Sequence, residues 1–467
     1  MTHGEMMKMF DGAGDFVARE LECGPFKLWA YSIDGLTSGQ AVSDYIIKPI
    51  AHQLRAEKMD ELYRLALRGF VYNAVAVPCQ DGADAAGKLV NGFCVVLFPG
   101  VGAIAFEVKT GEKRNPAPPE VENTVKGPKD AFVETGRTNT SLVRRHLRTP
   151  DLRIYETTVG QRSLTNVSVV YIEGLTDQNL VERMKSRLSA IDIDGLISPS
   201  GVEEYVTGSR ATAFPLIQYT ERPDKFCQGL LDGRVGLIVD GLPLAYLAPV
   251  DLMYLMDSPE DRGRDYITAS AVRILRYAAL VTSLLLPGLY IAIANFRQDL
   301  IPLPLLRAII ESKAAVPFST VAEVLGLLIT FELLQESGVH LPQAVGQSVS
   351  IIGGIVVGTA AVEAGIVSPI ALIVVSVAGV CGFVLPNRDL AEAIRMWRFV
   401  VAVFGAFAGP WGVLSAVLCL LIHLAGLKSM GIPYLQSNGR WSILRRRLKY
   451  EKWRNAALSP EDERNQK

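Results

Sequence analysis

Hydrophobic residues follow different patterns in the two halves of this chain of 467 residues. Between Phe26 and Asp261, short apolar stretches alternate with longer stretches whose apolar residues recur at helical spacing. The first pattern is typical of β-strands and the second of amphipathic helices. Between Tyr277 and Leu427, long runs carry no charge. The pattern predicts an α/β soluble N-terminal half with two lobes, followed by an all-α polytopic transmembrane domain.

The elements of the soluble half fall on both sides of a proline-rich segment that contains Pro116, Pro118 and Pro119. Proline disfavours helix and central strand because it fixes φ and lacks an N–H. In the first lobe, we expect strands at residues 26–33, 69–77, 93–98 and 103–108 and helices at 38–54 and 56–67. In the second lobe, we expect strands at 152–159, 166–174, 233–241 and 243–248 and helices at 130–147 and 180–191.

The predicted domain order has five regions. We expect a cytoplasmic α/β lobe 1 at residues 1–114, a Pro-rich linker at 115–126, a cytoplasmic α/β lobe 2 at 127–262, a transmembrane domain of five or six apolar segments at 273–430 and a basic cytoplasmic tail at 431–467.

Uncharged runs mark the membrane segments. Tyr277–Phe296 has 20 residues, which matches the roughly 20 that a helix needs to cross the hydrocarbon core. Leu341–Val362 and Ala364–Pro386 have 22 and 23 residues, and only Glu363 separates them. They predict a helical hairpin whose turn lies near Glu363 or contains Ser368–Pro369.

The last run, Phe399–Leu427, has 29 residues, which is long for one span. Gly409 and Pro410 lie near its middle. Because proline interrupts helical hydrogen bonding, the run predicts either one kinked, tilted helix or two short passages.

Acidic residues interrupt a further apolar segment, Val316–Leu334. Glu323 and Glu332 lie inside it, and Glu336 shares a helical face with Glu332. A charge at the centre of a membrane helix costs on the order of 2.5–3.5 kcal/mol on insertion scales. We therefore expect this segment to face protein or water, or to re-enter, with Glu323, Glu332 and Glu336 on its polar face.

Basic residues indicate the orientation in the membrane. Arginines precede the first span and follow the last, where they cluster between Arg440 and Arg454, whereas the turn at Glu363 has none. Arg297, Arg307 and Lys313 are exceptions. Because basic residues gather on the cytoplasmic side, both termini are predicted to be cytoplasmic, which requires an even number of crossings.

Small residues recur at helical spacing in two predicted membrane segments. Such residues let helices approach closely, either within one subunit or around a pore between subunits. They are Gly354, Gly358 and Ala361 in one segment and Gly405 and Gly409 in the other. Val362 and Glu363 end the first segment. Glu363 is either a solvated turn residue or part of a ring of carboxylates that attracts cations at a channel mouth.

Enzymatic and nucleic-acid-binding classes have little support in the sequence. The formal net charge of −1 provides no basic field for nucleic acid, and the six cysteines have no C-x-x-C spacing. The segment Gly82–Lys88 has the spacing of a phosphate-binding loop, but Leu89 replaces the required hydroxyl residue, so a solvent-exposed loop is preferred. We expect no catalytic, cofactor or metal site.

Residues 317–369, together with ordered matches along nearly the whole chain, resemble the A subunits of spore germinant receptors, the GerA family. The sequence departs from the family pattern at a few positions, such as Ser337, where the family has Ala. These departures bear on the receptor subtype and on the range of ligands. Matching residues in the second lobe are Gly127, Phe132, Glu134, Asn139, Arg144, Arg145, Glu221, Arg222, Pro223 and Asp224.

This resemblance implies a nutrient receptor subunit in the inner membrane of the endospore. It implies transporter-like B and lipoprotein C subunits as partners, and a homo-oligomeric, pentameric channel that releases monovalent cations to begin germination. Three alternatives stay open: a paralogue linked to dipicolinic acid release, a membrane enzyme acting on a nucleotide or lipid, and a non-conducting receptor scaffold.

Overall fold

The computed structural model describes residues 1–52, 56–71, 75–109, 119, 122, 127–196, 198–207, 212–339 and 358–435. The described residues form two compact units. The first, the soluble unit, comprises residues up to 207 together with 216–249. The second, which we call the membrane unit for its long apolar helices, comprises residues 212–215 and 250–435.

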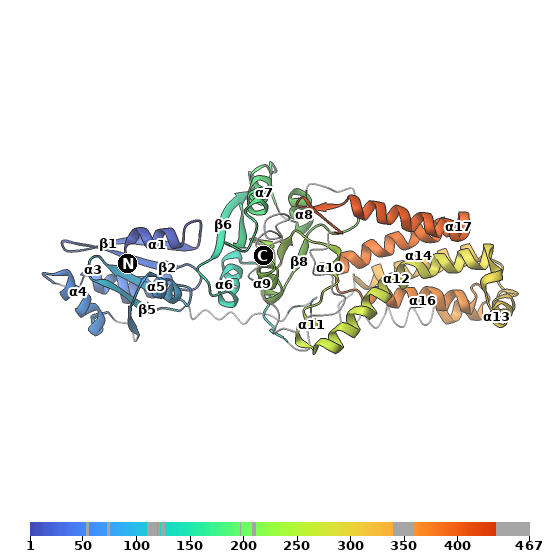
Figure 1. Cartoon of the computed structure of the whole chain (residues 1–467), viewed down its shortest axis with the longest axis horizontal. Helices are drawn as coiled ribbons and strands as arrows, with labels where there is room; N and C mark the ends of the chain where they lie inside the picture. Colours follow the sequence, from blue (N-terminus) through green and yellow to red (C-terminus); the bar gives the residue numbers. More distant parts are fainter. Residues whose placement is uncertain are drawn as a thin grey trace, which may run out of the picture. The chain divides into compact units, whose positions relative to one another are not determined.

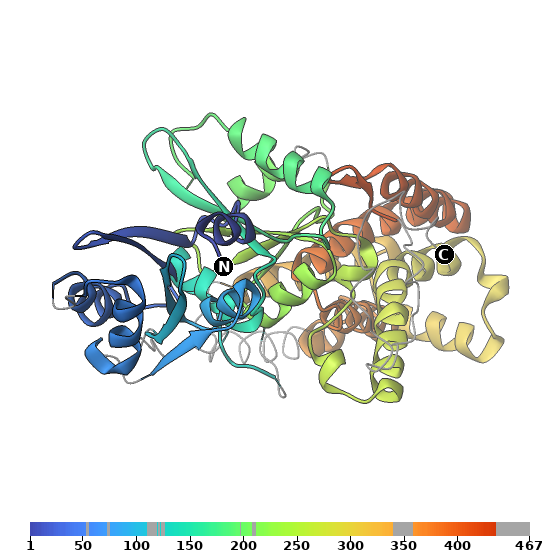
Figure 2. The same ribbon diagram turned by 60° about the vertical axis from the view of Figure 1, so that its left-hand side comes forward.

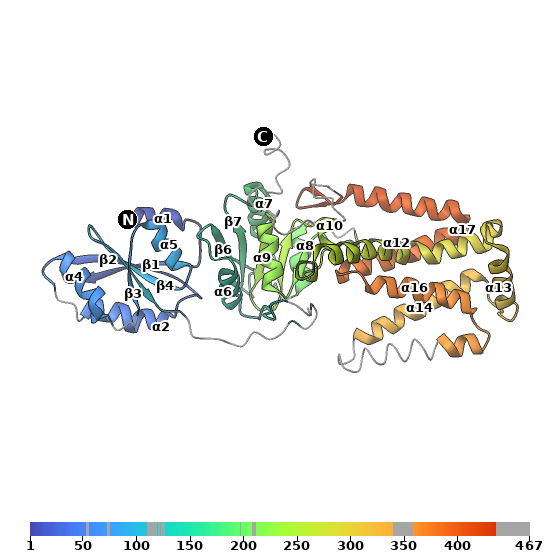
Figure 3. The same cartoon turned by 60° about the horizontal axis from the view of Figure 1, so that its bottom comes forward.

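The first lobe of the soluble unit is an antiparallel five-stranded sheet with helices on both faces (Figure 3). Its strands, in the order β1-β2-β4-β5-β3, are β1 (Phe16–Cys23), β2 (Phe26–Ile33), β3 (Ala76–Cys79), β4 (Phe93–Phe98) and β5 (Gly102–Glu107). One face packs against α2 (Gly39–Ala41), the π-helix η1 (Val42–Ile47), α3 (Lys48–His52), α4 (Met59–Leu65) and the π-helix η2 (Ala66–Phe70). The other face packs against α1 (His3–Met9) and α5 (Gly82–Leu89).

Burial on both faces explains the uninterrupted apolar sequence of β4. Cys94 and Val96 point into one core, and Val95 and Leu97 point into the other. A strand covered on both faces needs no polar alternation. The strands predicted at residues 26–33 and 93–98 are therefore confirmed to the residue.

Two predictions for this lobe were wrong. Residues 82–89 form the helix α5 rather than a loop, because Ala85, Ala86 and Leu89 are buried against the sheet and Asp81 caps the helix. The strand predicted at 69–77 starts only at Ala76, because the chain before it is helical up to Phe70.

The second lobe is another antiparallel five-stranded sheet (Figure 1). Its strands, in the order β6-β7-β9-β10-β8, are β6 (Leu152–Val159), β7 (Thr165–Ile172), β8 (Gln218–Thr220), β9 (Val235–Val239) and β10 (Ala245–Ala248). Its helices are α6 (Gly136–His146), α7 (Gln178–Ser189), α8 (Pro199–Thr207) and α9 (Pro223–Leu231). A side chain at Gly236 would lie 2.2 Å from the Phe226 ring, so β9 requires glycine where α9 crosses it.

The membrane unit is helical. It contains α10 (Leu252–Leu255), α11 (Glu260–Gly263), α12 (Tyr266–Phe296), the 3-10 helix η3 (Gln298–Leu300), α13 (Leu303–Lys313), α14 (Thr320–Val339), α16 (Pro369–Phe383), α17 (Arg388–Gly426) and a small hairpin of β11 (Lys428–Ser429) and β12 (Ile432–Pro433). Helix α12 packs along α16 and α17 (Figure 2). Among the described residues, α12 and α17 are long and apolar enough to cross a membrane.

Helix α17 turns back on itself at Gly409. This residue has φ +56° and ψ −138°, which is not helical. The rings of Trp397 and His423 lie 5.8 Å apart, whereas a straight helix would separate them by about 39 Å. Of the two possibilities for the long run Phe399–Leu427, the structure therefore has two short, adjacent arms (Figure 1).

The predicted hairpin around Glu363 is described in part. Residues 341–357 lie outside the described residues, whereas 358–363 are helical and a turn at 364–368 leads into α16. Helix α16 spans 15 residues, fewer than the uncharged run of 23, because that run also includes the turn before it and Pro386 after it.

Candidate functional site

Close backbone packing joins α12 to the first arm of α17. A Cβ atom at Gly405 would lie 2.7 Å from the carbonyl oxygen of Gly288. A Cβ atom at Gly288 would in turn lie 2.9 Å from the carbonyl oxygen of Val401. Gly409 permits the fold-back and faces Phe296. Sequence reasoning missed Gly288, although the Pro-Gly pair inside a predicted span was a signal.

The segment before Glu363 packs on α16 where it is described. Gly358 is buried, and a Cβ there would lie 3.4 Å from Leu372. Ala361 and Val362 are half-buried, and Glu363 is exposed as the last helical residue. Gly354 lies outside the described residues. The carboxylate of Glu363 is thus available to solvent at the end of the helix.

The acidic residues of α14 meet basic residues from neighbouring elements. The fully buried Glu323 side chain lies 3.3 Å from the Lys313 ammonium group. Glu332 lies 3.0 Å from Arg395 of α17 and 3.9 Å from Arg398. Glu336 is exposed on the same helix. Pairing of this kind explains how an apolar helix accommodates Glu323 and Glu332 within its length.

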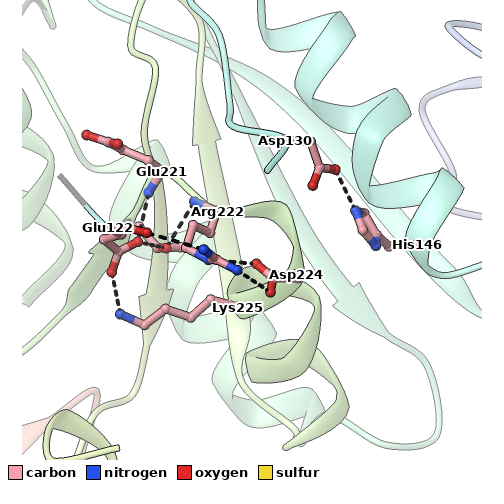
Figure 4. Close-up of polar contacts among 8 residues, drawn as sticks. Glu122, Asp130, His146, Glu221, Arg222, Asp224 and Lys225 are labelled. Atoms are coloured by element: carbon pink, nitrogen blue, oxygen red, sulfur yellow. Dashed lines mark hydrogen bonds and ion pairs between the residues drawn. The ribbon is translucent and has the colours of Figure 1, made fainter. Parts of the chain in front are cut away.

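A polar cluster in the second lobe contains three of the ten family-motif residues, Glu221, Arg222 and Asp224 (Figure 4). Arg222 is buried and donates two hydrogen bonds to the carboxylate of Asp224, at 2.8 and 3.0 Å. The carboxylate of Glu122 accepts hydrogen bonds from Thr220, from the Glu221 N–H and from Lys225, the last at 2.6 Å. Arg222 also donates to the carbonyl oxygen of Glu122. The cluster therefore ties the chain at Glu122 to the start of α9.

A hydrogen-bonded pair lies beside this cluster (Figure 4). The ring of His146 lies 2.8 Å from the carboxylate of Asp130. The hydrogen bond from His146 lowers the pKa of Asp130, although burial opposes the shift.

Three other motif residues hold the second lobe together. Phe132 packs edge-on against Phe226, and its N–H donates to the Glu221 carbonyl oxygen. Asn139 is fully buried and bonds the backbone of Val133 through both ends of its amide. The carbonyl oxygen of Glu134 accepts the N–H of Gly241.

Three further motif residues have separate places in this lobe. Pro223 opens α9, where its missing N–H costs nothing. Arg145 is exposed, and Gly127 lies at the start of the second lobe.

Arg144 joins the two lobes. Its guanidinium donates two hydrogen bonds of 2.8 Å to the carboxylate of Asp15, and both side chains are only 1% exposed. Next to this pair, the N–H of Gly14 donates to the Ile154 carbonyl oxygen of β6 at 2.7 Å. Sequence reasoning named Arg144 but not Asp15, because nothing in the sequence connects residues so far apart.

The described residues contain no group of three or more side chains suited to hold a metal ion. Burial raises the pKa of the Cys94 thiol to about 12 and that of Cys79 to about 11. Both thiols are therefore protonated at neutral pH, and neither is an activated nucleophile.

Comparisons with known proteins place this arrangement in a family. The sequence model described as "Bacillus/Clostridium GerA spore germination protein" matches residues 4–455. The chain is 33% identical over 431 residues to the uncharacterized membrane protein YfkQ of Bacillus subtilis, covering 91% of this chain and 83% of that protein. It is 36% identical over 370 residues to spore germination protein A1 of the same organism, covering 79% and 77%.

A solved structure is also similar. The N-terminal domain of the A subunit of the Bacillus megaterium spore germinant receptor GerK3 is 26% identical and covers 52% of this chain and 91% of that one, with a TM-score of 0.41. The family model matches almost the full length, and the relatives that are similar in sequence agree with it. This chain therefore belongs to the GerA family of spore germination proteins.

Proposed function

We propose that this chain is the A subunit of a nutrient germinant receptor in the inner membrane of the spore, where copies of it form a ligand-gated cation channel that begins germination. The observation that carries this proposal is the GerA match over residues 4–455. We further propose that the subunit works with transporter-like B and lipoprotein C subunits, and that its homo-oligomer is a pentamer.

The fold-back of α17 supports a topology with both termini in the cytoplasm. In this topology α12, α14, the run Leu341–Val362, α16 and the two arms of α17 each cross once. Six crossings return the chain to the side on which it started, as the basic clusters require. Arg395, near the start of the first arm of α17, then lies toward the cytoplasmic side.

The turn after Glu363 supports a place for cation selection. Glu363 is exposed, and it is the only charged residue between Leu341 and Pro386. In a symmetric ring, several copies of this carboxylate would surround one axis and raise the local concentration of cations. Gly358, Ala361 and Val362 would then belong to the segment that lines or supports the pore.

Substitution of Glu363 tests the proposal in spores. Glu363→Gln should slow potassium release after nutrient addition, and Glu363→Lys should slow it further because it reverses the charge. Both variants should reach the normal protein level, measured by immunoblot, since the side chain is exposed. Glu311→Gln, at an exposed position of α13, is the matched control. Wild-type release kinetics in the Lys variant would remove Glu363 from the ion path.

A further inference from the structure

One buried carboxylate connects three elements at the end of the membrane unit where α14 begins. Glu323 lies in the first turn of α14, and its side chain has no exposed surface. One of its oxygens accepts the backbone N–H of Ser368 at 3.1 Å, and the other lies 3.3 Å from the ammonium group of Lys313. Lys313 is the last residue of α13, and Ser368 caps α16.

The carboxylate and the Ser368 N–H depend on each other. A buried carboxylate is costly unless a charge and hydrogen bonds compensate for the lost water. Lys313 supplies the charge, and Ser368 supplies a hydrogen bond to one oxygen, whereas the other oxygen accepts none within the described residues. Ser368 is fully buried, so its N–H has no access to water. Its hydroxyl oxygen accepts the N–H of Ala371 at the start of α16. Removing the carboxylate would therefore leave a buried donor without a partner, which is costly.

The carboxylate also ties the turn at 364–368 to another helix. The backbone hydrogen bonds of this turn go to nearby residues of the same segment, as from Gly365 to Val362 and from Ile366 to Ala361. The bond from Ser368 to Glu323, by contrast, spans 45 positions of sequence. The turn immediately follows Glu363, so whatever fixes the turn also fixes the place of that exposed carboxylate.

We propose that Glu323 is a positioning residue: together with Lys313 it holds the turn at 364–368 against the start of α14 and so sets the position of Glu363. The consequence for conduction rests on the proposed channel, whereas the fixing of the turn does not. The two are measured separately.

Cysteine accessibility measures the turn itself. Val367 is 8% exposed, so a Val367→Cys chain, purified at full length, should react slowly with a maleimide after subtraction of the parent's labelling. Adding Glu323→Leu should raise the labelling rate by about tenfold, because the turn opens locally. Adding Glu323→Gln should raise it less, since an amide oxygen still accepts the Ser368 N–H. Glu311→Gln, at the exposed control position, should leave the rate unchanged.

Two further readouts keep the test decisive. Lys313→Met leaves the carboxylate in place without its cation and should give an intermediate labelling rate. This variant replaces Glu323→Leu in the test if size exclusion shows that the Leu variant does not assemble. Unchanged labelling in an assembled Leu variant, or in both the Gln and Met variants, would overturn the positioning role. Faster labelling with unchanged potassium flux would support the positioning role and remove the turn from the proposed conduction path.

Discussion

Buried charges are held differently in the soluble unit and among helices α13 to α17 of the membrane unit. Arg144 and Arg222 are each 1% exposed, and each presents two nitrogens to both oxygens of one aspartate at 2.8–3.0 Å. Arg398 is equally buried, but its nearest carboxylate, Glu332, is 3.9 Å away and also pairs with Arg395. Within the described residues, two of its nitrogens have no hydrogen-bond partner.

This difference separates a fixed region from one that can rearrange. A bidentate arginine–carboxylate pair has one favourable geometry, and a buried one restrains both chain segments. A long single contact fixes less, and Glu332 has two arginines within reach. We interpret the lobes of the soluble unit as rigidly joined through Arg144, and the α14–α17 contact as one that can exchange partners when the membrane helices move.

The largest effect is expected where a bidentate pair is broken. Arg144→Met leaves Asp15 ionised and buried without its partner, which should lower the free energy of unfolding by about 3–5 kcal/mol. Urea unfolding of the full chain in detergent, followed by tryptophan fluorescence, measures the loss. Lys27→Met, which removes an exposed pair with Glu20, is the control and should leave stability nearly unchanged. Equal stability of the two variants would show that the lobes are not held by this pair.

Replacing the buried Arg398 of the membrane unit by methionine should leave the free energy of unfolding unchanged or raise it. Arg398→Met removes a poorly paired buried charge and fills the site with an apolar side chain, which is often neutral or stabilising. Glu332 keeps Arg395 at 3.0 Å. The same unfolding measurement should therefore show unchanged or higher stability. A loss as large as that of Arg144→Met would erase the distinction between the soluble unit and helices α13 to α17.

The smallest effect concerns acid stability. Because His146 lowers the folded-state pKa of Asp130, the pair contributes stability above the unfolded pKa of about 3.9, and this is lost as pH falls through the folded value. His146→Gln should move the acid-unfolding midpoint slightly upward in pH. Asp194→Asn, whose partner Arg162 is largely exposed, is the control and should leave the midpoint in place. A midpoint shifted downward in His146→Gln would contradict the role of the pair.

The sequence predicted three strands to the residue. β2, β4 and β6 match the expected residues because β-branched and aromatic side chains are frequent in each of them. The strand β1 was missed because its sequence, FVARELEC, carries charges, which are tolerated at the edge of a sheet. The helix α5 was taken for a loop because alanines rather than large side chains form its buried face.

Long-range partners were beyond the reach of the sequence. The sequence predicted that Glu323 and Glu332 face protein or water. It did not show that Glu323 contacts Lys313 and Ser368, or that Glu332 lies near two arginines. The fold-back at Gly409 was one of two possibilities, and only the positive φ and the contact between Trp397 and His423 decide between them. Local pattern determines elements, whereas the pairing of buried charges depends on how those elements pack.

Potassium efflux from liposomes tests most directly whether copies of this chain conduct cations. The purified chain is reconstituted with the proposed B subunit into potassium-loaded liposomes, and efflux is followed after nutrient addition. Wild-type protein should release potassium on nutrient addition, and the Glu363→Lys variant should release it more slowly at equal incorporation. Wild-type protein that is oligomeric and correctly inserted, yet gives no efflux above that of empty liposomes, would contradict channel function and favour a non-conducting scaffold.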